Sequence, residues 1–470
     1  MRAKRAVAAG FAAVLVGLWG QRPDLTIKIE GKGGRVRIAV PDFRGPGLEA
    51  AVGRTFNATL WNDLESSGVL EMASKSFYAT AAPARPEDFK PPIVPQVPQR
   101  RLRKGEKAPP PPEPIRQGPW LDDWSRPPVT AALLAFGSLA VDQGRFQVSA
   151  WLYDVTKTDL GTAHVFGKRY LSTNDEEGAR RVAHELASDI LQKLGAGPGI
   201  TGSRIYFVSN RTGNKEIWAM DYDGSNQRAI TQYRSITINP SVSPDGTLVA
   251  FTTFARGNPG IFIHSLETNR RLTFYNQVAS LNATPGFSPD GRRVAFSSSI
   301  SGRPQLYIAN LDGSDLRRIS HSLAVEVEPK FNPRTGAQIA FTSGRGGGPP
   351  QIYLMDVDGA NVQRLVSGGG DAVNPGWSPD GQRLAFSWTR GYEPGNYNVF
   401  VLEIATQQMT QLTFGAGRNE HPSWAPDGRH IVFSSNRAGG TQIWTMLADG
   451  TQVKQLSAQG ANEMPEWGVK

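Results

Sequence analysis

The sequence of 470 residues contains no cysteine. That absence excludes disulfide scaffolds, thiol catalysis, thiolate metal sites and lipid attachment to cysteine. The chain also lacks the Gly-x-Ser-x-Gly elbow of serine hydrolases, and its six histidines show no paired ligand spacing for zinc. Two Asp-x-Asp-Gly segments, at 221–224 and 356–359, lack the glutamate that completes a calcium loop and predict turns. We therefore expect a protein that is not an enzyme, with no catalytic residues, no metal and no cofactor.

Long hydrophobic runs are also missing from the sequence. The apolar stretch from Ala6 to Trp19 is too short to span a bilayer comfortably, and it follows three basic residues within the first five. This layout is typical of a secretory signal, so we predict a signal peptide over residues 1–20 and no membrane span after processing. The residues directly before Gly20 do not form an Ala-x-Ala motif, so the cleavage position stays open and an uncleaved anchor is an alternative.

Excess positive charge is confined to two segments of the chain. The formal net charge is +9, of which residues 1–20 contribute +3 and residues 81–118 contribute +4, from eight basic and four acidic residues. The remainder is nearly neutral, which argues against a nucleic-acid partner. The segment 81–118 also contains eleven prolines, so we assign no fold to it. A solvated linker is favoured there over a partner-docking segment.

The C-terminal part of the sequence contains a repeat with a period of about 45 residues. The turn motif Ser243-Pro244-Asp245-Gly246 returns, in this or a related form, at 288–291, 332–336, 378–381 and 425–428. Proline presets φ, aspartate bonds to its own backbone and glycine takes a positive φ, so each motif predicts a tight hairpin. A period of this length indicates propeller blades of four short antiparallel strands, not a helical solenoid.

The ends of the repeat array predict how the ring closes. The second-strand pattern occurs six times, starting at Arg204-Ile205-Tyr206-Phe207, which no aromatic inner strand precedes. The chain ends on an unpaired inner-strand motif, Met464-Pro465-Glu466-Trp467. We therefore predict an all-β propeller of six blades over residues 199–470, closed by the C-terminal strand. Closure of this kind removes exposed sheet edges.

An α/β domain is predicted ahead of the propeller, over residues 36–198, with the proline-rich basic insertion at 81–118. Its signals are short runs typical of strands and two segments whose apolar residues recur at four-residue spacing, as on one face of a helix. A sheet covered by two helices makes a two-layer domain. The predicted strands cover 36–40, 131–141, 145–154 and 162–171, and the predicted helices run from about Leu48 to Gly68 and from Asn174 to Gly195.

The chain resembles the TolB family of periplasmic propeller proteins over nearly its whole length outside the insertion. The segments that carry the resemblance are Ala39-Val40-Pro41-Asp42-Phe43-Arg44-Gly45 with Pro46-Gly47, Arg204-Ile205-Tyr206-Phe207, and Asp221-Tyr222-Asp223-Gly224-Ser225-Asn226-Gln227. The order of a signal, a short extended segment, an α/β domain and a propeller with Ser-Pro-Asp-Gly turns also matches that family.

The resemblance implies a periplasmic adaptor of the Tol-Pal system, not a catalyst. Members of the family link inner-membrane Tol proteins to the peptidoglycan-associated lipoprotein Pal, supporting outer-membrane integrity and constriction during cell division. The implied partners are Pal for the propeller, and TolA with other inner-membrane Tol proteins for a switch segment at residues 21–35; we expect a monomer. Alternating residues that could pair with a partner as an edge strand are Thr26, Ile27, Lys28, Ile29 and Glu30.

Loop lengths indicate which face of the propeller binds a partner. The second-to-third strand connections vary from 301–304 to 389–398, whereas the other turns within the blades keep nearly fixed lengths. The residues before the inner-strand prolines open onto the variable face, and we predict that they contact Pal: Asn239, Thr284, Glu328, Asn374, His421 and Met464. Thr284 and Glu328 are favoured because their flanking runs resemble the family's Pal-contacting loops.

Two other interpretations stay open at this point. Any one of these six residues could be an ordinary polar loop end without a binding role. The whole chain could also be a propeller lectin or a small-ligand-binding protein of the periplasm.

Overall fold

The computed structural model describes residues 35–469, except 79–80, 94, 96–113, 198, 269, 273, 275–278, 391–394 and 416. The predicted signal peptide, nearly all of the predicted switch segment at 21–35, including residues 26–30, and most of the insertion lie outside the described residues.

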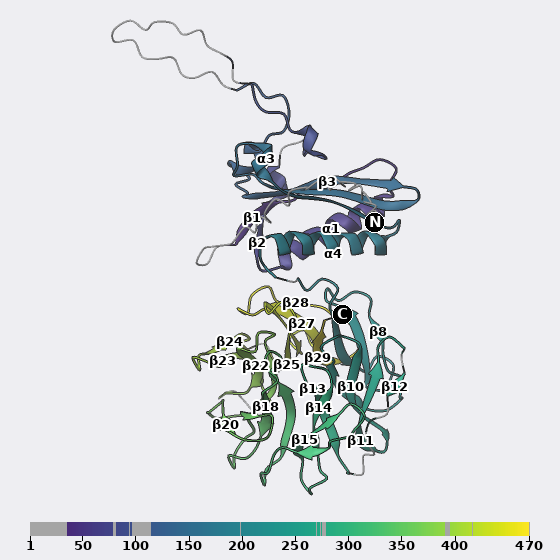
Figure 1. Cartoon of the computed structure of the whole chain (residues 1–470), viewed down its shortest axis with the longest axis vertical. Helices are drawn as coiled ribbons and strands as arrows, with labels where there is room; N and C mark the ends of the chain where they lie inside the picture. Colours follow the sequence, from purple (N-terminus) through teal and green to yellow (C-terminus); the bar gives the residue numbers. More distant parts are fainter. Residues whose placement is uncertain are drawn as a thin grey trace, which may run out of the picture.

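The N-terminal part of the described chain is a five-stranded sheet with two long helices on one face (Figure 1). Its strands are β1 (Val36–Ala39), β2 (Leu70–Met72), β3 (Leu133–Asp142), β4 (Arg145–Asp154) and β5 (His164–Thr173), and its long helices are α1 (Ala50–Ser66) and α4 (Glu176–Lys193). The strand order is β2-β1-β3-β4-β5, with β1 parallel to both of its neighbours and the rest antiparallel. The expected α/β layering is confirmed.

Both long helices have an apolar face, and α4 also has a capping side chain at its N-terminus. The Asp175 carboxylate accepts a hydrogen bond from the Gly178 N–H at 2.7 Å, so Asp175 is the N-cap and α4 begins at Glu176, two residues after the predicted Asn174. The apolar face of each helix packs onto the sheet and excludes water there. The buried residues on that face include Val52, Phe56, Leu60 and Leu64 of α1, and Val182, Leu186 and Ile190 of α4.

The proline-rich insertion is ordered at its two ends, which differs from the expectation of no fold. Pro86–Asp88 form a short 3-10 helix, and Ile93 pairs with Ile115 in an antiparallel bridge. Phe89 is buried, and its ring centroid lies 5.3 Å from that of Phe136 on β3. These ends cover part of the sheet face that α1 and α4 leave open. Burial of the large aromatic side chain of Phe89 stabilises their contact with the sheet.

The C-terminal part of the chain is a ring of six antiparallel four-stranded sheets (Figure 1). Their inner strands contact one another in the order β9, β13, β17, β21, β25 and β29, and β29 contacts β9. Listed from the inner strand outward, blade 1 is β29 (Asn462–Gly468), β6 (Arg204–Ser209), β7 (Glu216–Asp221), β8 (Arg228–Ala229); blade 2 is β9 (Thr237–Val242), β10 (Leu248–Arg256), β11 (Asn258–Ser265), β12 (Arg271–Leu272); blade 3 is β13 (Asn282–Phe287), β14 (Arg293–Ser298), β15 (Gln305–Asn310), β16 (Arg317–Arg318); blade 4 is β17 (Glu326–Phe331), β18 (Gln338–Ser343), β19 (Gln351–Asp356), β20 (Gln363–Arg364); blade 5 is β21 (Ala372–Trp377), β22 (Arg383–Trp388), β23 (Asn398–Glu403), β24 (Met409–Gln411); and blade 6 is β25 (Asn419–Trp424), β26 (His430–Ser435), β27 (Gln442–Leu447), β28 (Lys454–Gln455).

The Ser-Pro-Asp-Gly segments form the predicted hairpin turns between the first and second strands. In blade 2, the Asp245 carboxylate accepts hydrogen bonds from the Ser243 hydroxyl and from the Thr247 N–H, the latter at 3.0 Å. The hydrogen bond from Ser243 is the main reason that the pKa of Asp245 lies below its usual range. Gly246 has φ +71°, a conformation that glycine adopts without steric cost.

The C-terminal strand closes the ring, as the sequence predicts. β29 pairs antiparallel with β6, placing Trp467 opposite Ile205 and Glu466 opposite Tyr206. The Trp467 side chain is buried, and its indole N–H donates to the Ser203 hydroxyl at 2.9 Å. The first blade therefore takes three strands from the beginning of the propeller and one from its end.

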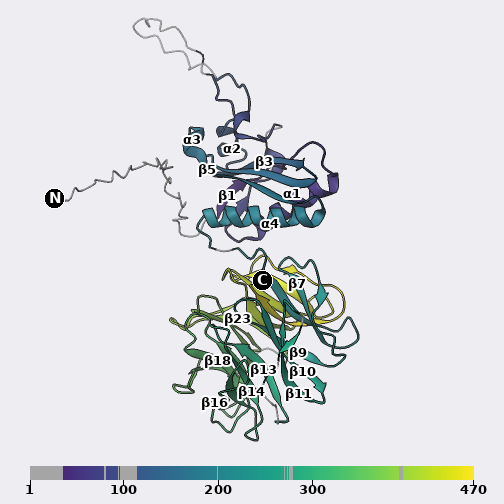
Figure 2. The ribbon, with the colours of Figure 1, turned by 45° about the vertical axis from the view of Figure 1, so that its right-hand side comes forward.

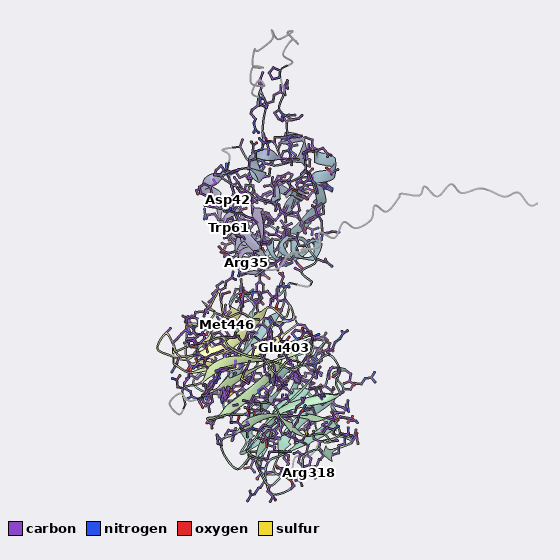
Figure 3. All side chains as sticks on the ribbon, turned by 90° about the vertical axis from the view of Figure 1, so that its left-hand side faces the viewer. Arg35, Asp42, Trp61, Arg318, Glu403 and Met446 are labelled. Atoms are coloured by element: carbon purple, nitrogen blue, oxygen red, sulfur yellow. The ribbon has the colours of Figure 1, made fainter. Side chains whose placement is uncertain are left out.

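Blades 6 and 1 contact the α/β part through their turns (Figure 2). Arg429 and His430, after the first turn of blade 6, reach carbonyl oxygens at the end of α1, and His430 Nε2 lies 2.7 Å from the oxygen of Ser66. Figure 3 shows Met446 of blade 6 close to the α/β part and Arg318 of blade 3 at the far end of the propeller. The variable loops face away from the turns that make this contact, because the two sets of connections leave opposite ends of the strands.

A buried polar cluster joins the two parts of the molecule at this contact. The hydroxyl of Tyr222, from blade 1, donates to Asp63 of α1 and lies 2.8 Å from Nδ1 of His184, from α4. His184 Nδ1 also lies 2.7 Å from the Asp63 carboxylate. Burial lowers the pKa of His184, but the hydrogen bond and charge of Asp63, with the charges of Asp223 and Asp221, outweigh burial and raise it.

Replacing Trp467 with alanine tests the importance of ring closure. We expect Trp467→Ala to lower the free energy of unfolding by about 3–5 kcal/mol, as for other buried tryptophans. Urea unfolding monitored by circular dichroism measures the change. Val469→Ala is the control, because Val469 lies near the same strand end but is 40% exposed, so its loss should cost within about 0.5 kcal/mol. Equal effects of the two substitutions would contradict the proposed role of Trp467.

The raised pKa of His184 predicts a pH-dependent contribution to stability. This contribution is fully present below the pKa of an unfolded histidine, about 6.5, and is lost as the pH rises through the higher pKa of folded His184. The stability difference between wild type and His184→Gln should therefore be larger at about pH 5.5 than at about pH 9 in thermal unfolding. The exposed His321→Gln provides the control, because His321 is a histidine outside the cluster of Asp63, His184 and Tyr222. A difference for His184→Gln that does not change with pH contradicts this prediction.

Candidate functional site

Every inner strand of the propeller is interrupted at the residue that precedes its proline. The pairing register with the second strand shifts at this point in all six blades, which marks a β-bulge. Each of these residues has a left-handed backbone, which costs a non-glycine residue roughly 1–2 kcal/mol. The φ values are 53° for Asn239, 52° for Thr284, 58° for Glu328, 57° for Asn374, 53° for His421 and 52° for Met464.

The structure brings these six residues together around one cavity at the variable face of the channel. The cavity has a volume of about 60 Å³, and we call it the mouth pocket. Its walls are the six left-handed residues and the prolines that follow five of them, all except Glu328, and Lys330 and Glu466 complete its lining. The residues predicted from the sequence to contact Pal are therefore neighbours in space, and their binding role stays a prediction.

Hydrogen bonds between blades fix the wall of the mouth pocket. The Glu328 N–H donates to the Thr284 hydroxyl of the preceding blade at 3.1 Å. The Glu328 carboxylate in turn accepts from the Asn374 N–H at 2.8 Å, from the Asn374 side-chain amide at 2.7 Å and from the Thr342 hydroxyl at 2.7 Å. The His421 N–H donates to the Ser387 hydroxyl at 3.1 Å. Because each contact joins adjacent elements, the pocket is held in shape before any partner arrives.

An ion pair across the channel forms the floor of the mouth pocket. Lys330 Nζ lies 3.1 and 3.0 Å from the two carboxylate oxygens of Glu466. These residues come from blades 4 and 1, which lie opposite each other in the ring. Below the pair lies a second cavity of about 260 Å³, lined by inner-strand aromatic residues, and Lys330 and Glu466 line both cavities. The ion pair therefore divides the channel.

The other four blades carry only glycine or serine where blades 4 and 1 carry the charged pair. At Gly286, an added Cβ would lie 2.4 Å from the carbonyl oxygen of Pro329 on the next blade, so a side chain has no room there. Lys330 and Glu466 were not among the site residues predicted from the sequence. The available signal was a charge at the position after the inner-strand proline in only two of the six repeats.

An apolar group on a fixed loop lies at the rim of the variable face, between blades 3 and 4. Leu323 is 87% exposed, and Val325 and Ile300 are also exposed. The Arg303 guanidinium donates to the Leu323 carbonyl at 2.6 Å, and the Gln305 side-chain amide donates to the carbonyl of the next residue at 2.7 Å. An exposed apolar side chain held on an ordered loop is accessible to a protein partner. These residues were not among those predicted from the sequence.

Within the described ranges, no group of three or more histidine or acidic residues could hold a metal ion. In the third-to-fourth turn of blade 4, Asp358 accepts a hydrogen bond from the N–H of Ala360 at 3.0 Å, as in a side-chain-capped turn. None of the helices in the described part of the chain is long and apolar enough to cross a membrane.

The fold and the pocket define a class of protein: a six-bladed propeller attached to an α/β domain, with a polar pocket at one mouth of its channel. The family model described as the TolB beta propeller domain matches residues 191–386 and 366–470. These matches cover more than half of the chain. The chain belongs to the TolB family.

Individual relatives agree with this assignment. The chain is 39% identical over 228 residues to the Tol-Pal system protein TolB of Bordetella pertussis, covering 48% of this chain and 50% of that protein. It is 34% identical over 219 residues to the protein TolB homolog of Chlorobium luteolum, covering 47% of this chain and 48% of that protein. The chain thus spans about half the length of the curated relatives it matches.

A solved structure shares the whole arrangement. The crystal structure of TolB from Acinetobacter baumannii matches with a TM-score of 0.71 and 24% sequence identity, covering 93% of this chain and 97% of that chain. At this level of identity the likeness shows the fold.

A double-mutant cycle tests the ion pair that divides the channel. We expect Lys330→Met and Glu466→Gln to be coupled in urea unfolding by about 0.5–3 kcal/mol, as for contacting groups. Both side chains are less than one third exposed, so solvent screens their interaction only partly. The control cycle joins Lys215 and Glu463, a more exposed pair, whose coupling should stay below about 1 kcal/mol. A smaller coupling for the channel pair than for the control contradicts our interpretation.

Proposed function

We propose that this protein is a periplasmic adaptor of the Tol-Pal system and acts by binding other proteins, without catalysing a reaction. Its propeller binds the peptidoglycan-associated lipoprotein Pal at the mouth pocket and rim, and the segment at residues 21–35 binds TolA. The link supports outer-membrane integrity and constriction during cell division. Membership of the TolB family supports the assignment of this protein to the Tol-Pal system.

The observation that carries the Pal proposal is the ring of six strained residues around the mouth pocket. Left-handed non-glycine residues are costly, and such strain persists where the surrounding structure enforces it, often at binding sites. Here the strain turns six side chains toward one cavity on the face that is free of the α/β part. The exposed Leu323 adds apolar area on the same face as that cavity, as expected where a protein partner docks.

The TolA proposal concerns a different part of the chain. Residues 26–30 alternate apolar and polar side chains, a pattern that suits addition to the edge of a partner's sheet. This segment precedes β1 in the sequence and contains none of the six residues predicted to contact Pal.

Binding of Pal, measured by isothermal titration calorimetry, tests the proposed site. We expect Leu323→Ser to weaken Pal binding about tenfold or more, because exposed apolar anchors contribute strongly to protein interfaces. The reversal Glu328→Lys should also weaken binding. Val362→Ser is the matched control, since Val362 is an exposed apolar residue in the third-to-fourth turn of blade 4, on the opposite face. Unchanged affinity for both site variants, with normal melting temperatures, would place the Pal contact elsewhere.

A further inference from the structure

The mouth pocket contains a hydrogen-bond acceptor on Asn374 that the protein leaves unused. The Asn374 side-chain nitrogen donates to Oε1 of Glu328 at 2.7 Å. A carboxylate only accepts hydrogen bonds, so this contact fixes which end of the amide faces Glu328. The remaining atom, Asn374 Oδ1, is buried and has no hydrogen-bond partner among the described residues. An acceptor left in this state costs free energy of about 1–3 kcal/mol unless a ligand or water satisfies it.

A second unused atom lies on the adjacent blade. His421 Nδ1 is also buried without a hydrogen-bond partner in the described part of the chain. His421 and Asn374 occupy equivalent positions in blades 6 and 5, and both line the mouth pocket. In a neutral imidazole with its proton on Nε2, Nδ1 is an acceptor.

The mouth pocket also carries one negative charge that no cation compensates. One lysine and two glutamates line it, and Lys330 pairs with Glu466. Over the described ranges, no lysine, arginine or histidine nitrogen lies within 4.0 Å of the Glu328 carboxylate, which is bound by neutral donors from Asn374 and Thr342. A ligand that complements this pocket therefore has a positive charge and donates hydrogen bonds.

The size of the cavity narrows the choice of cation. The mouth pocket is small, with a volume of about 60 Å³. An ammonium group is a compact charge with three donors and no acceptor, whereas a guanidinium is a wider planar fork. The proline rings in the pocket wall suit the methylene groups of a lysine stem, which pack on apolar surface while the charged end reaches polar partners.

We propose that the mouth pocket binds a primary ammonium group, supplied by a lysine side chain of Pal, which donates hydrogen bonds to Asn374 Oδ1 and to the Glu328 carboxylate, with His421 Nδ1 as a further acceptor. This inference rests on the proposed function, because Pal supplies the lysine. It adds the chemistry by which the pocket recognises its partner.

The first experiment tests the pocket without Pal. n-Butylammonium is titrated into the full protein while NMR follows the imidazole signals of His421. We expect a saturable shift with n-butylammonium, no shift with 1-butanol, and at least a tenfold loss of affinity in Glu328→Gln, which removes the charge but keeps the size of the side chain. No saturable shift, an equal response to 1-butanol, or unchanged affinity in Glu328→Gln overturns the inference.

The second experiment identifies the lysine. Each lysine of Pal is changed to glutamine, and the affinity of each variant is measured against wild type and Glu328→Gln. We expect one lysine whose loss weakens binding about tenfold to wild type but has little effect on binding to Glu328→Gln. The Glu403→Gln variant, on the third strand of blade 5 and outside the mouth pocket, is the control and should show no coupling.

The outcomes separate this inference from the proposed function. Tight Pal binding with no lysine coupled to Glu328 overturns the ammonium proposal and leaves Pal as the partner. Absence of Pal binding overturns the proposed function and with it the lysine donor, even where n-butylammonium binds. A saturable n-butylammonium shift together with one coupled lysine supports both.

Discussion

The pairing of β29 with β6 joins the last strand of the chain to the first strand of the propeller, and the mouth pocket depends on it. β29 supplies Met464 to the wall of the pocket, Glu466 to its floor and Trp467 to the packing between blades. Without this strand, blade 1 would expose an edge and Lys330 would lose its partner. Ring closure therefore builds the candidate site as well as the fold. Loss of β29 would disrupt both.

Six similar blades create the ring, but the chemistry of the pocket comes from differences among them. The left-handed residue and its proline recur in every inner strand and give the pocket its shape. Glu328 is the only acidic residue among the six left-handed positions, and the charged floor pair occupies two opposite blades. A ring of identical residues could not orient an asymmetric partner. These differences between the blades make the mouth pocket chemically asymmetric, as recognition of a partner in one orientation requires.

Much of this architecture follows from local sequence rules. Turn chemistry and the period of about 45 residues predicted the blades, and the unmatched motifs at the two ends predicted closure. The position of the prolines also led to the six pocket residues. The contacts that the sequence did not reveal join residues that are far apart along the chain. Lys330 and Glu466 are 136 positions apart, and Tyr222 and Asp63 are 159 apart, so no local pattern indicates that they meet.

The ends of the insertion show a different limit of prediction from sequence. Their high proline content favours an extended backbone, but Pro86–Asp88 form a 3-10 helix, and Phe89 contacts a hydrophobic surface on β3 that composition alone does not reveal. The same holds for Leu323, whose loop is ordered by Arg303 and Gln305 from the neighbouring connection. In both cases a contact with another segment of the chain fixes the local structure. The local sequence is compatible with that structure but does not determine it.

The floor ion pair explains how a polar pocket can discriminate without being strongly charged. Two partly buried charges cost desolvation free energy, which contact with both carboxylate oxygens of Glu466 offsets. Because the pair is neutral as a whole, the electrostatic character of the pocket is set by Glu328. In the proposed complex with Pal, the exposed Leu323 would supply apolar area, the usual source of affinity, whereas Glu328 and Asn374 would supply directional acceptors. Affinity and orientation would then come from chemically distinct parts of one face.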